Sequence, residues 1–81
     1  MTGYYVYILF SPKLNKYYIG STNNLQRRLS DHNRGKSTFT KPGIPWELKH
    51  FEEFESKTQA CQREMEIKRR KDRKYIENLI K

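Results

Sequence analysis

Two short aromatic stretches separated by six turn-forming residues constrain the fold of this chain more than any other feature. Residues 4–10 read YYVYILF, residues 17–21 read YYIGS, and the segment between them, SPKLNK, contains Pro12 and Asn15. Aromatic and β-branched residues favour strands and the intervening residues favour a turn, so the segment predicts a β-hairpin. Because the first strand is apolar or aromatic throughout, we expect it to be covered on both faces.

The length of this loop predicts the register of the hairpin. A six-residue loop places Phe10 opposite Tyr17 and Tyr7 opposite Gly20. Tyr7 and Tyr18 then become diagonal neighbours on one face of the sheet, whereas a shift of one residue would separate them. Gly20 has no side chain, so it leaves room for a ligand or another backbone to approach the strand closely.

The remaining residues predict helices around a third strand. Cap and breaker residues delimit a helix to about Asn33, a loop over 35–45, a strand over 46–54, a helix from Ser56 toward Lys71, and a last helix over about 72–80. We therefore expect one α+β domain over residues 1–81. Its architecture would be a small, mainly antiparallel three-stranded sheet flanked by helices, in the order β-β-α-β-α-α.

Charge and composition narrow the class of partner. The net charge of +8 is typical of a protein that binds a polyanion, and nucleic acid is the expected partner. No apolar run approaches the roughly 20 residues of a membrane span, and no secretory signal pattern opens the chain, so we expect a cytoplasmic protein without membrane contact. One cysteine and two histidines exclude an internal disulfide and a four-ligand zinc site.

Charged side chains fall on the apolar faces of two predicted helices. At about 100° per residue, Arg28 and His32 lie in the same arc as Leu25 and Leu29. Glu64 likewise lies within the apolar stripe of its own helix. Charges that face a core are unfavourable unless they are paired, so these positions are candidates for a functional site.

A run of basic residues near the C-terminus predicts a contact with nucleic-acid phosphates, and its alternative is a solvated helix face. Exposed aromatic side chains such as Phe39 or Trp46 could stack on unpaired bases, although a tryptophan at a strand start is more often a core residue. The predicted nucleic-acid-binding residues are Arg27, Lys68, Arg69, Arg70, Lys71, Arg73 and Lys74.

Taken together, the motifs resemble the GIY-YIG nuclease domain. Its two tripeptides correspond to Tyr5-Val6-Tyr7, where a tyrosine replaces the first glycine, and to the intact Tyr18-Ile19-Gly20. Residues 21–35 resemble the helix that carries the family's arginine and histidine, and residues 60–68 resemble the helix with its metal-binding glutamate. The chain is similar to small stand-alone bacterial members, and to the N-terminal nuclease domains of the excision-repair incision subunit and of homing endonucleases.

This resemblance implies a role for each site residue. Tyr7, Tyr18 or both would act as general base, with His32 as hydrogen-bond partner or proton relay. Arg28 would stabilise charge on the transferring phosphate. Glu64 would be the catalytic carboxylate that binds a divalent metal, Mg²⁺ or alternatively Mn²⁺. Gly20 would keep the strand end open to the nucleic-acid backbone.

Each residue also has a structural interpretation. The tyrosines could be sheet packing, Arg28 could pair with Glu64, and Glu64 could pair with Lys68 one turn later. The joint pattern favours a metal-dependent endonuclease that nicks DNA or recognises its structure, with little sequence specificity and weak activity. The alternatives are a non-catalytic nucleic-acid-binding protein that retains the fold and an accessory protein that docks on a protein partner; a homodimer stays open.

Overall fold

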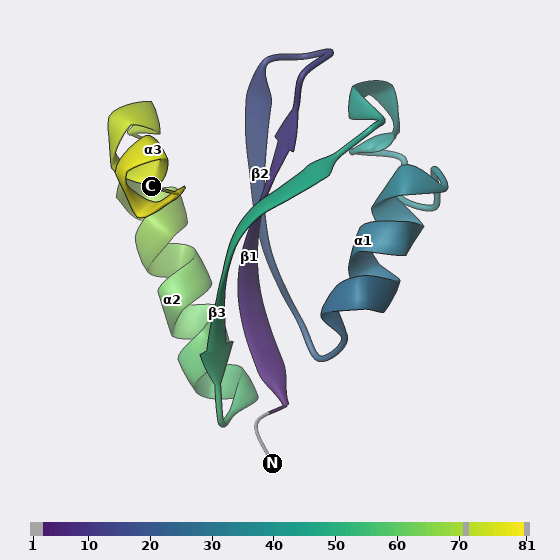
Figure 1. Cartoon of the computed structure of the whole chain (residues 1–81). Helices are drawn as coiled ribbons and strands as arrows, with labels where there is room; N and C mark the ends of the chain where they lie inside the picture. The colour runs from purple at the N-terminus through teal and green to yellow at the C-terminus, as the bar shows by residue number, and fades with distance from the viewer. Residues whose placement is uncertain (1–2, 71, 81) are drawn as a thin grey trace.

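The computed structural model describes residues 3–70 and 72–80, and it shows a three-stranded sheet between helices (Figure 1). Helix α1 lies on one side of the sheet, and α2 with α3 lies on the other. None of the helices in these residues is long and apolar enough to cross a membrane. The elements are β1 (Tyr4–Ser11), β2 (Lys16–Thr22), α1 (Leu25–Asn33), the 3₁₀ turn η1 (Lys41–Gly43), β3 (Glu47–Phe54), α2 (Lys57–Arg70) and α3 (Arg73–Ile80).

The sheet is antiparallel with strand order β2-β1-β3, and this confirms the predicted fold class and element order. The hairpin also has the predicted register, since Phe10 pairs with Tyr17 and Tyr7 pairs with Gly20. Between Ile8 and Leu9 the pairing of β1 with β3 shifts. The strand order makes β1 the central strand and β2 and β3 the edges of the sheet.

The two faces of β1 support two separate hydrophobic clusters, as its unbroken apolar sequence predicts. Val6 and Ile8 pack against residues of α2 and α3, including Ile67. Tyr7 and Leu9 face the other way and pack against Trp46 and residues of α1. Because alternate residues of a strand point to opposite faces, this central strand holds the two helical layers together.

Side chains cap helices α1 and α2. Asn24 caps α1 by accepting a hydrogen bond from the Arg27 backbone N–H at 3.1 Å. Ser56 precedes α2, and its Oγ accepts from the Gln59 backbone N–H at 3.2 Å. After α1, Gly35 adopts φ +78°, a left-handed conformation that favours glycine. These caps fix where α1 and α2 begin, and so fix which side chains face the sheet.

Candidate active site

The side chain of Tyr7 extends from the central strand β1 to the edge strand β2. The side chain is 2% exposed, and its hydroxyl lies directly over Gly20. A Cβ atom at position 20 would lie 2.5 Å from the Tyr7 hydroxyl oxygen and 2.7 Å from its Cζ. The close approach predicted at Gly20 is therefore made by a side chain of the same molecule, which fills the space that we expected nucleic acid to occupy.

We expect Gly20→Ala to destabilise the protein by about 1–3 kcal/mol, because the new methyl group would displace a buried phenol ring. The variant should also separate Tyr7 from its hydrogen-bond partners on α1. Urea denaturation measures the first effect, and cleavage by the folded variant measures the second. Gly3→Ala is the matched control, since a Cβ there meets no atom within 4 Å; equal stability of the two variants would contradict the prediction.

His32 is buried on α1 and bonded through both ring nitrogens. Its Nε2 lies 3.1 Å from the Tyr7 hydroxyl, and its Nδ1 lies 2.8 Å from Thr40 Oγ1. The Thr40 hydroxyl donates to the Ser37 carbonyl at 3.5 Å, so it accepts from the imidazole Nδ1–H. The neutral ring then accepts at Nε2, and the Tyr7 hydroxyl donates to it.

Thr40 is a site residue that the sequence did not indicate. It is 1% exposed, and it fixes the orientation and the tautomer of His32. Its loop, over residues 35–45, is rich in turn-forming residues, and a threonine there looks like any other turn residue. Only the tertiary contact between this loop and α1 reveals its role.

Arg28 lies one turn before His32 and faces both tyrosines. Its guanidinium interacts with the Tyr7 phenol and with the Tyr18 hydroxyl, and both interactions raise the pKa of Arg28. Burial raises the pKa of Tyr7, and the hydrogen bond from Arg28 opposes that rise. The Tyr18 ring lies 6.4 Å from that of Tyr7 and 5.0 Å from that of His32. The structure thus brings these four predicted site residues together.

Burial, followed by the charge of Arg28, lowers the pKa of His32 below its usual 6.5. Below pH 6.5 the unfolded chain binds a proton at this residue that the folded chain does not bind. We therefore expect the free energy of unfolding to fall as the pH falls below 6.5, by up to about 1.4 kcal/mol per pH unit. Urea denaturation between pH 7.5 and 5.5 measures this slope. His32→Gln should have a flatter slope, and identical slopes would contradict the assignment.

Glu64 lies on α2, so it comes from the opposite side of the sheet. Its side chain is 20% exposed and forms an ion pair with Lys68 at 2.7 Å, as the structural interpretation of the sequence anticipated. Its charge still acts on the Tyr7 phenol and raises the pKa of that group. The candidate residues thus flank the edge strand β2, with Arg28 on one side and Glu64 on the other.

A hollow of about 390 Å³ lies beside this edge and includes Arg28. Lys57 contributes a second cation to it from the first turn of α2, a position that the sequence analysis did not single out. The signal was present, because Lys57, Ala60 and Glu64 are spaced to share one helix face. The lining residues are Tyr4, Ser21, Thr22, Asn23, Arg28, Lys57 and Ala60.

The comparison with known families identifies the family of the chain. The family model described as the GIY-YIG catalytic domain matches residues 3–76, which is most of the chain. The chain belongs to the GIY-YIG family. This family is a nuclease family, so the residues around Tyr7 and Arg28 occupy the catalytic domain of a nuclease fold.

Small proteins of the same family are similar over most of their length. A UPF0213 protein from Bacillus velezensis is 45% identical over 67 residues, which cover 78% of this chain and 68% of that protein. A UPF0213 protein from Natronomonas pharaonis is 44% identical over 66 residues, covering 80% and 76%. The solution NMR structure of UPF0213 protein BH0048 from Bacillus halodurans has a TM-score of 0.59 and 34% identity, and the match covers 96% of this chain and 82% of that one.

GIY-YIG nucleases generally use divalent metals. In residues 3–70 and 72–80, no group of three or more His, Cys, Asp or Glu side chains is placed to hold a metal. A single carboxylate is nevertheless sufficient for Mg²⁺, which retains several waters and takes substrate phosphate oxygens as ligands. The ion would have to replace Lys68 as the partner of the Glu64 carboxylate.

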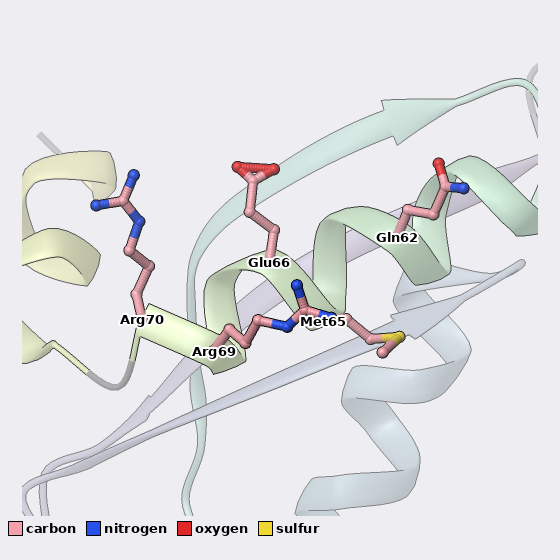
Figure 2. Close-up of a pocket in the computed structure, with 5 residues that line it drawn as sticks. All are labelled: Gln62, Met65, Glu66, Arg69 and Arg70. Carbon is pink, nitrogen blue, oxygen red and sulfur yellow. The ribbon is translucent and has the colours of Figure 1, made fainter.

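The C-terminal basic residues do not form one continuous strip. Arg69 and Arg70 line a hollow of about 480 Å³ on the outer face of α2, together with Gln62, Met65 and Glu66. Figure 2 shows Arg69 lying along Met65, whereas Arg70 points toward α3. Residues 68, 69 and 70 advance by about 100° each, so they face three directions.

Several of these cations have partners within the protein. Arg70 lies over the Tyr75 ring at 4.6 Å. Arg73 donates to the Asn15 carbonyl at 3.0 Å and to its Oδ1 at 2.7 Å, which holds the tip of the β1–β2 hairpin. Arg27 and Lys74 are exposed, and Lys71 lies outside the described residues. Binding of nucleic acid by this set stays a prediction.

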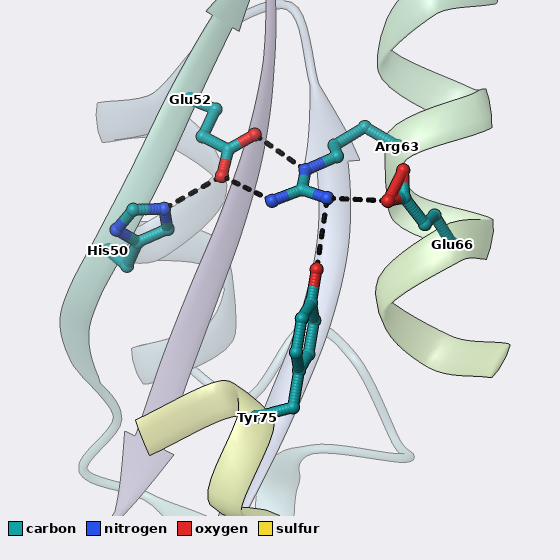
Figure 3. A network of polar contacts seen from close by, with 5 residues as sticks. All are labelled: His50, Glu52, Arg63, Glu66 and Tyr75. Carbon is teal, nitrogen blue, oxygen red and sulfur yellow. Dashed lines mark hydrogen bonds and ion pairs between the residues drawn. The ribbon is translucent and has the colours of Figure 1, made fainter. Parts of the chain in front are cut away.

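The side of α2 that faces β3 carries a structural network (Figure 3). Arg63 forms two hydrogen bonds with Glu52, at 2.8 and 3.1 Å, and also contacts Glu66 and the Tyr75 hydroxyl. Arg63, more than His50, lowers the pKa of the Glu52 carboxyl. This network joins β3, α2 and α3, and so it holds the helix that carries Glu64 in its orientation.

Proposed function

We propose that this protein is a divalent-metal-dependent endonuclease that hydrolyses DNA phosphodiester bonds. The observation that carries the proposal is the position of the Tyr7 phenol, which is hydrogen-bonded to His32 and lies within the electrostatic influence of Arg28. Sheet packing alone requires neither contact. A buried phenol between a permanent cation and a neutral imidazole is suited to proton transfer beside a bound phosphate.

In this mechanism the scissile phosphate binds in the hollow beside β2. The planar guanidinium of Arg28 matches the geometry of phosphate oxygens, and Lys57 contacts the strand from the opposite helix. A metal held by Glu64 would supply charge neutralisation on the phosphate and acidify a bound water. The partly exposed Glu64 carboxylate comes from α2, which lies on the side of the sheet opposite to α1 and Arg28, so the two groups would act on the phosphate from different directions.

Tyr7 transfers a proton in this scheme without becoming an anion. Its oxygen takes the proton of the attacking water while its own proton moves to His32 Nε2, along the 3.1 Å hydrogen bond. The raised pKa of Tyr7 does not oppose this route, because the phenol gains one proton as it loses another. The lowered pKa of His32 makes the imidazolium a short-lived acceptor, which returns the proton through Tyr7 to the leaving oxygen. Thr40 keeps the receiving nitrogen unprotonated by accepting the Nδ1–H of the same ring.

A second function is favoured by one contact, the ion pair between Glu64 and Lys68. If this pair persists in the presence of metal, the carboxylate is occupied and the protein binds nucleic acid without cleaving it. Arg28, Lys57 and the other exposed cations would then supply salt-dependent contacts to phosphates.

Cleavage of supercoiled plasmid distinguishes the two functions. The protein is incubated with plasmid in Mg²⁺, in Mn²⁺ and in EDTA, and binding to labelled DNA is followed by fluorescence anisotropy. Nicking that requires the metal is the expected result. Binding without cleavage in either metal, on plasmid and on branched DNA, would support the non-catalytic function instead.

A further inference from the structure

Phe39 is a large apolar side chain that the fold leaves almost entirely in water. It is 83% exposed, more than any other large hydrophobic side chain in residues 3–70 and 72–80. Trp46 was the other candidate for stacking on a base. Its side chain is only 6% exposed, so it belongs to the core. A single exposed apolar residue is common on protein surfaces, so its position and rigidity decide whether it has a function.

The position of Phe39 is next to the candidate active site. Its ring centroid lies 6.3 Å from that of Tyr18, and the Tyr18 ring lies 6.4 Å from that of Tyr7. The three rings therefore form a row that begins at the buried phenol and ends at the surface. This row connects the candidate active-site residues Tyr7 and Tyr18 with the protein surface at Phe39.

The backbone on either side of Phe39 is held firmly. The next residue, Thr40, is buried; its hydroxyl bonds His32, and its carbonyl accepts from Trp46 Nε1 at 2.7 Å. Asn33 closes the loop, because its side chain bonds both the N–H and the carbonyl of Trp46, at 2.6 and 3.0 Å. The ring is thus presented on an anchored loop, so little conformational entropy is lost when a ligand stacks on it.

The loop around Phe39 is also basic. Residues 34–41 read RGKSTFTK, with Arg34, Lys36 and Lys41 and no acidic residue. Lys36 approaches Asp31 at 3.6 Å, and its side chain is still 58% exposed. An aromatic side chain surrounded by cations is the arrangement that proteins use for single-stranded nucleic acid, since every base has a π-face and every phosphate a charge.

We propose that Phe39 is a stacking platform for an unpaired base, which directs the enzyme to DNA with a single-stranded segment beside the cleavage point. In a continuous duplex each base is already stacked between its neighbours and has no free face for Phe39. The role in directing cleavage rests on the proposed nuclease function. Base stacking on Phe39 is a binding property that can be measured without cleavage.

The test compares Phe39→Ala and Phe39→Trp with Phe51→Ala. Phe51 is the matched control, because it is 51% exposed and its ring contacts Tyr5 instead of Tyr18. Binding is measured by anisotropy in EDTA, on a labelled single-stranded DNA and on a blunt duplex of equal length. We expect Phe39→Ala to weaken single-strand binding about 5- to 150-fold and to change duplex binding less than about twofold. Phe39→Trp should retain single-strand affinity, and its fluorescence should be quenched by the single strand.

Three results would overturn the inference: unchanged single-strand affinity in Phe39→Ala, equal losses on both DNAs, or an equal loss in Phe51→Ala. Absence of DNA binding by the unmodified protein would also overturn it, and the ring would then belong to a different kind of partner. Because EDTA prevents metal-dependent cleavage, loss of the stacking effect is distinguished from failure of the nuclease proposal, which is measured on plasmid in Mg²⁺.

Discussion

Replacing Arg28 with alanine is expected to slow DNA cleavage by about 10³-fold at saturating DNA, because the variant lacks the donor that neutralises the transferring phosphate. The guanidinium lies at the hollow beside β2 and contacts Tyr7 and Tyr18, so its loss affects the phosphate and the phenols together. Tyr7 retains its hydrogen bond to His32, so the fold should persist. Single-turnover nicking of plasmid with protein in excess measures the effect on chemistry.

Arg27→Ala removes the same charge from the neighbouring position and provides the comparison. Arg27 is exposed, and it lines a smaller polar hollow with Arg28 near the start of α1. We expect this variant to bind DNA more weakly at high salt and to retain most of its turnover at saturating DNA. If both variants lost cleavage only in proportion to binding, Arg28 would have no catalytic role. Arg28→Lys should fall between them, since it keeps the charge and loses the planar fork.

Replacing Glu64 with glutamine is expected to lower metal-dependent cleavage at least about 100-fold, because a neutral amide is a poor ligand for Mg²⁺. The amide oxygen can still accept a hydrogen bond from Lys68, which lies 2.7 Å from the carboxylate, so the helix should be unaffected. The measurements are plasmid nicking in Mg²⁺ and Mn²⁺ binding followed by electron paramagnetic resonance. The second readout is independent of cleavage.

Glu66→Gln is the matched control for this variant. Glu66 lies on the same helix and pairs with Arg63, but it faces away from the β2 edge. We expect it to bind Mn²⁺ and to nick plasmid like the unmodified protein. Normal Mn²⁺ affinity in Glu64→Gln would show that Glu64 is not a metal ligand. Normal cleavage by that variant would refute the mechanism proposed for the carboxylate.

The hairpin and the first helix could be predicted from the sequence because local rules determine them. A six-residue loop and a side-chain period of two set the pairing of Tyr7 with Gly20, and a helical period of 3.6 places Arg28 and His32 on the face toward the sheet. These two periodicities together predict that the three side chains meet. The predicted convergence therefore follows from geometry that each segment expresses within a few residues.

The features that the sequence did not predict depend on contacts between distant segments. Thr40 supports His32 only because an irregular loop folds back over α1, and Arg73 bonds Asn15 across 58 positions of sequence. The space at Gly20 could be predicted but not its occupant, because either a ligand or Tyr7 can fill it. The different directions of the C-terminal basic side chains could be predicted from helix geometry, because three successive residues of a helix cannot share one face.

The arrangement of the site on both sides of β2 has a consequence for the order in which the protein is made. Tyr7, Arg28 and His32 are synthesised in the first half of the chain, whereas Glu64 follows on α2, which Arg63 joins to β3. On the proposed mechanism, a growing chain that has emerged only as far as β3 contains the phenol and the imidazole but has no Glu64 carboxylate to bind metal. Hydrolytic capacity then arises late in translation, so incomplete chains cannot damage the cell's own nucleic acids.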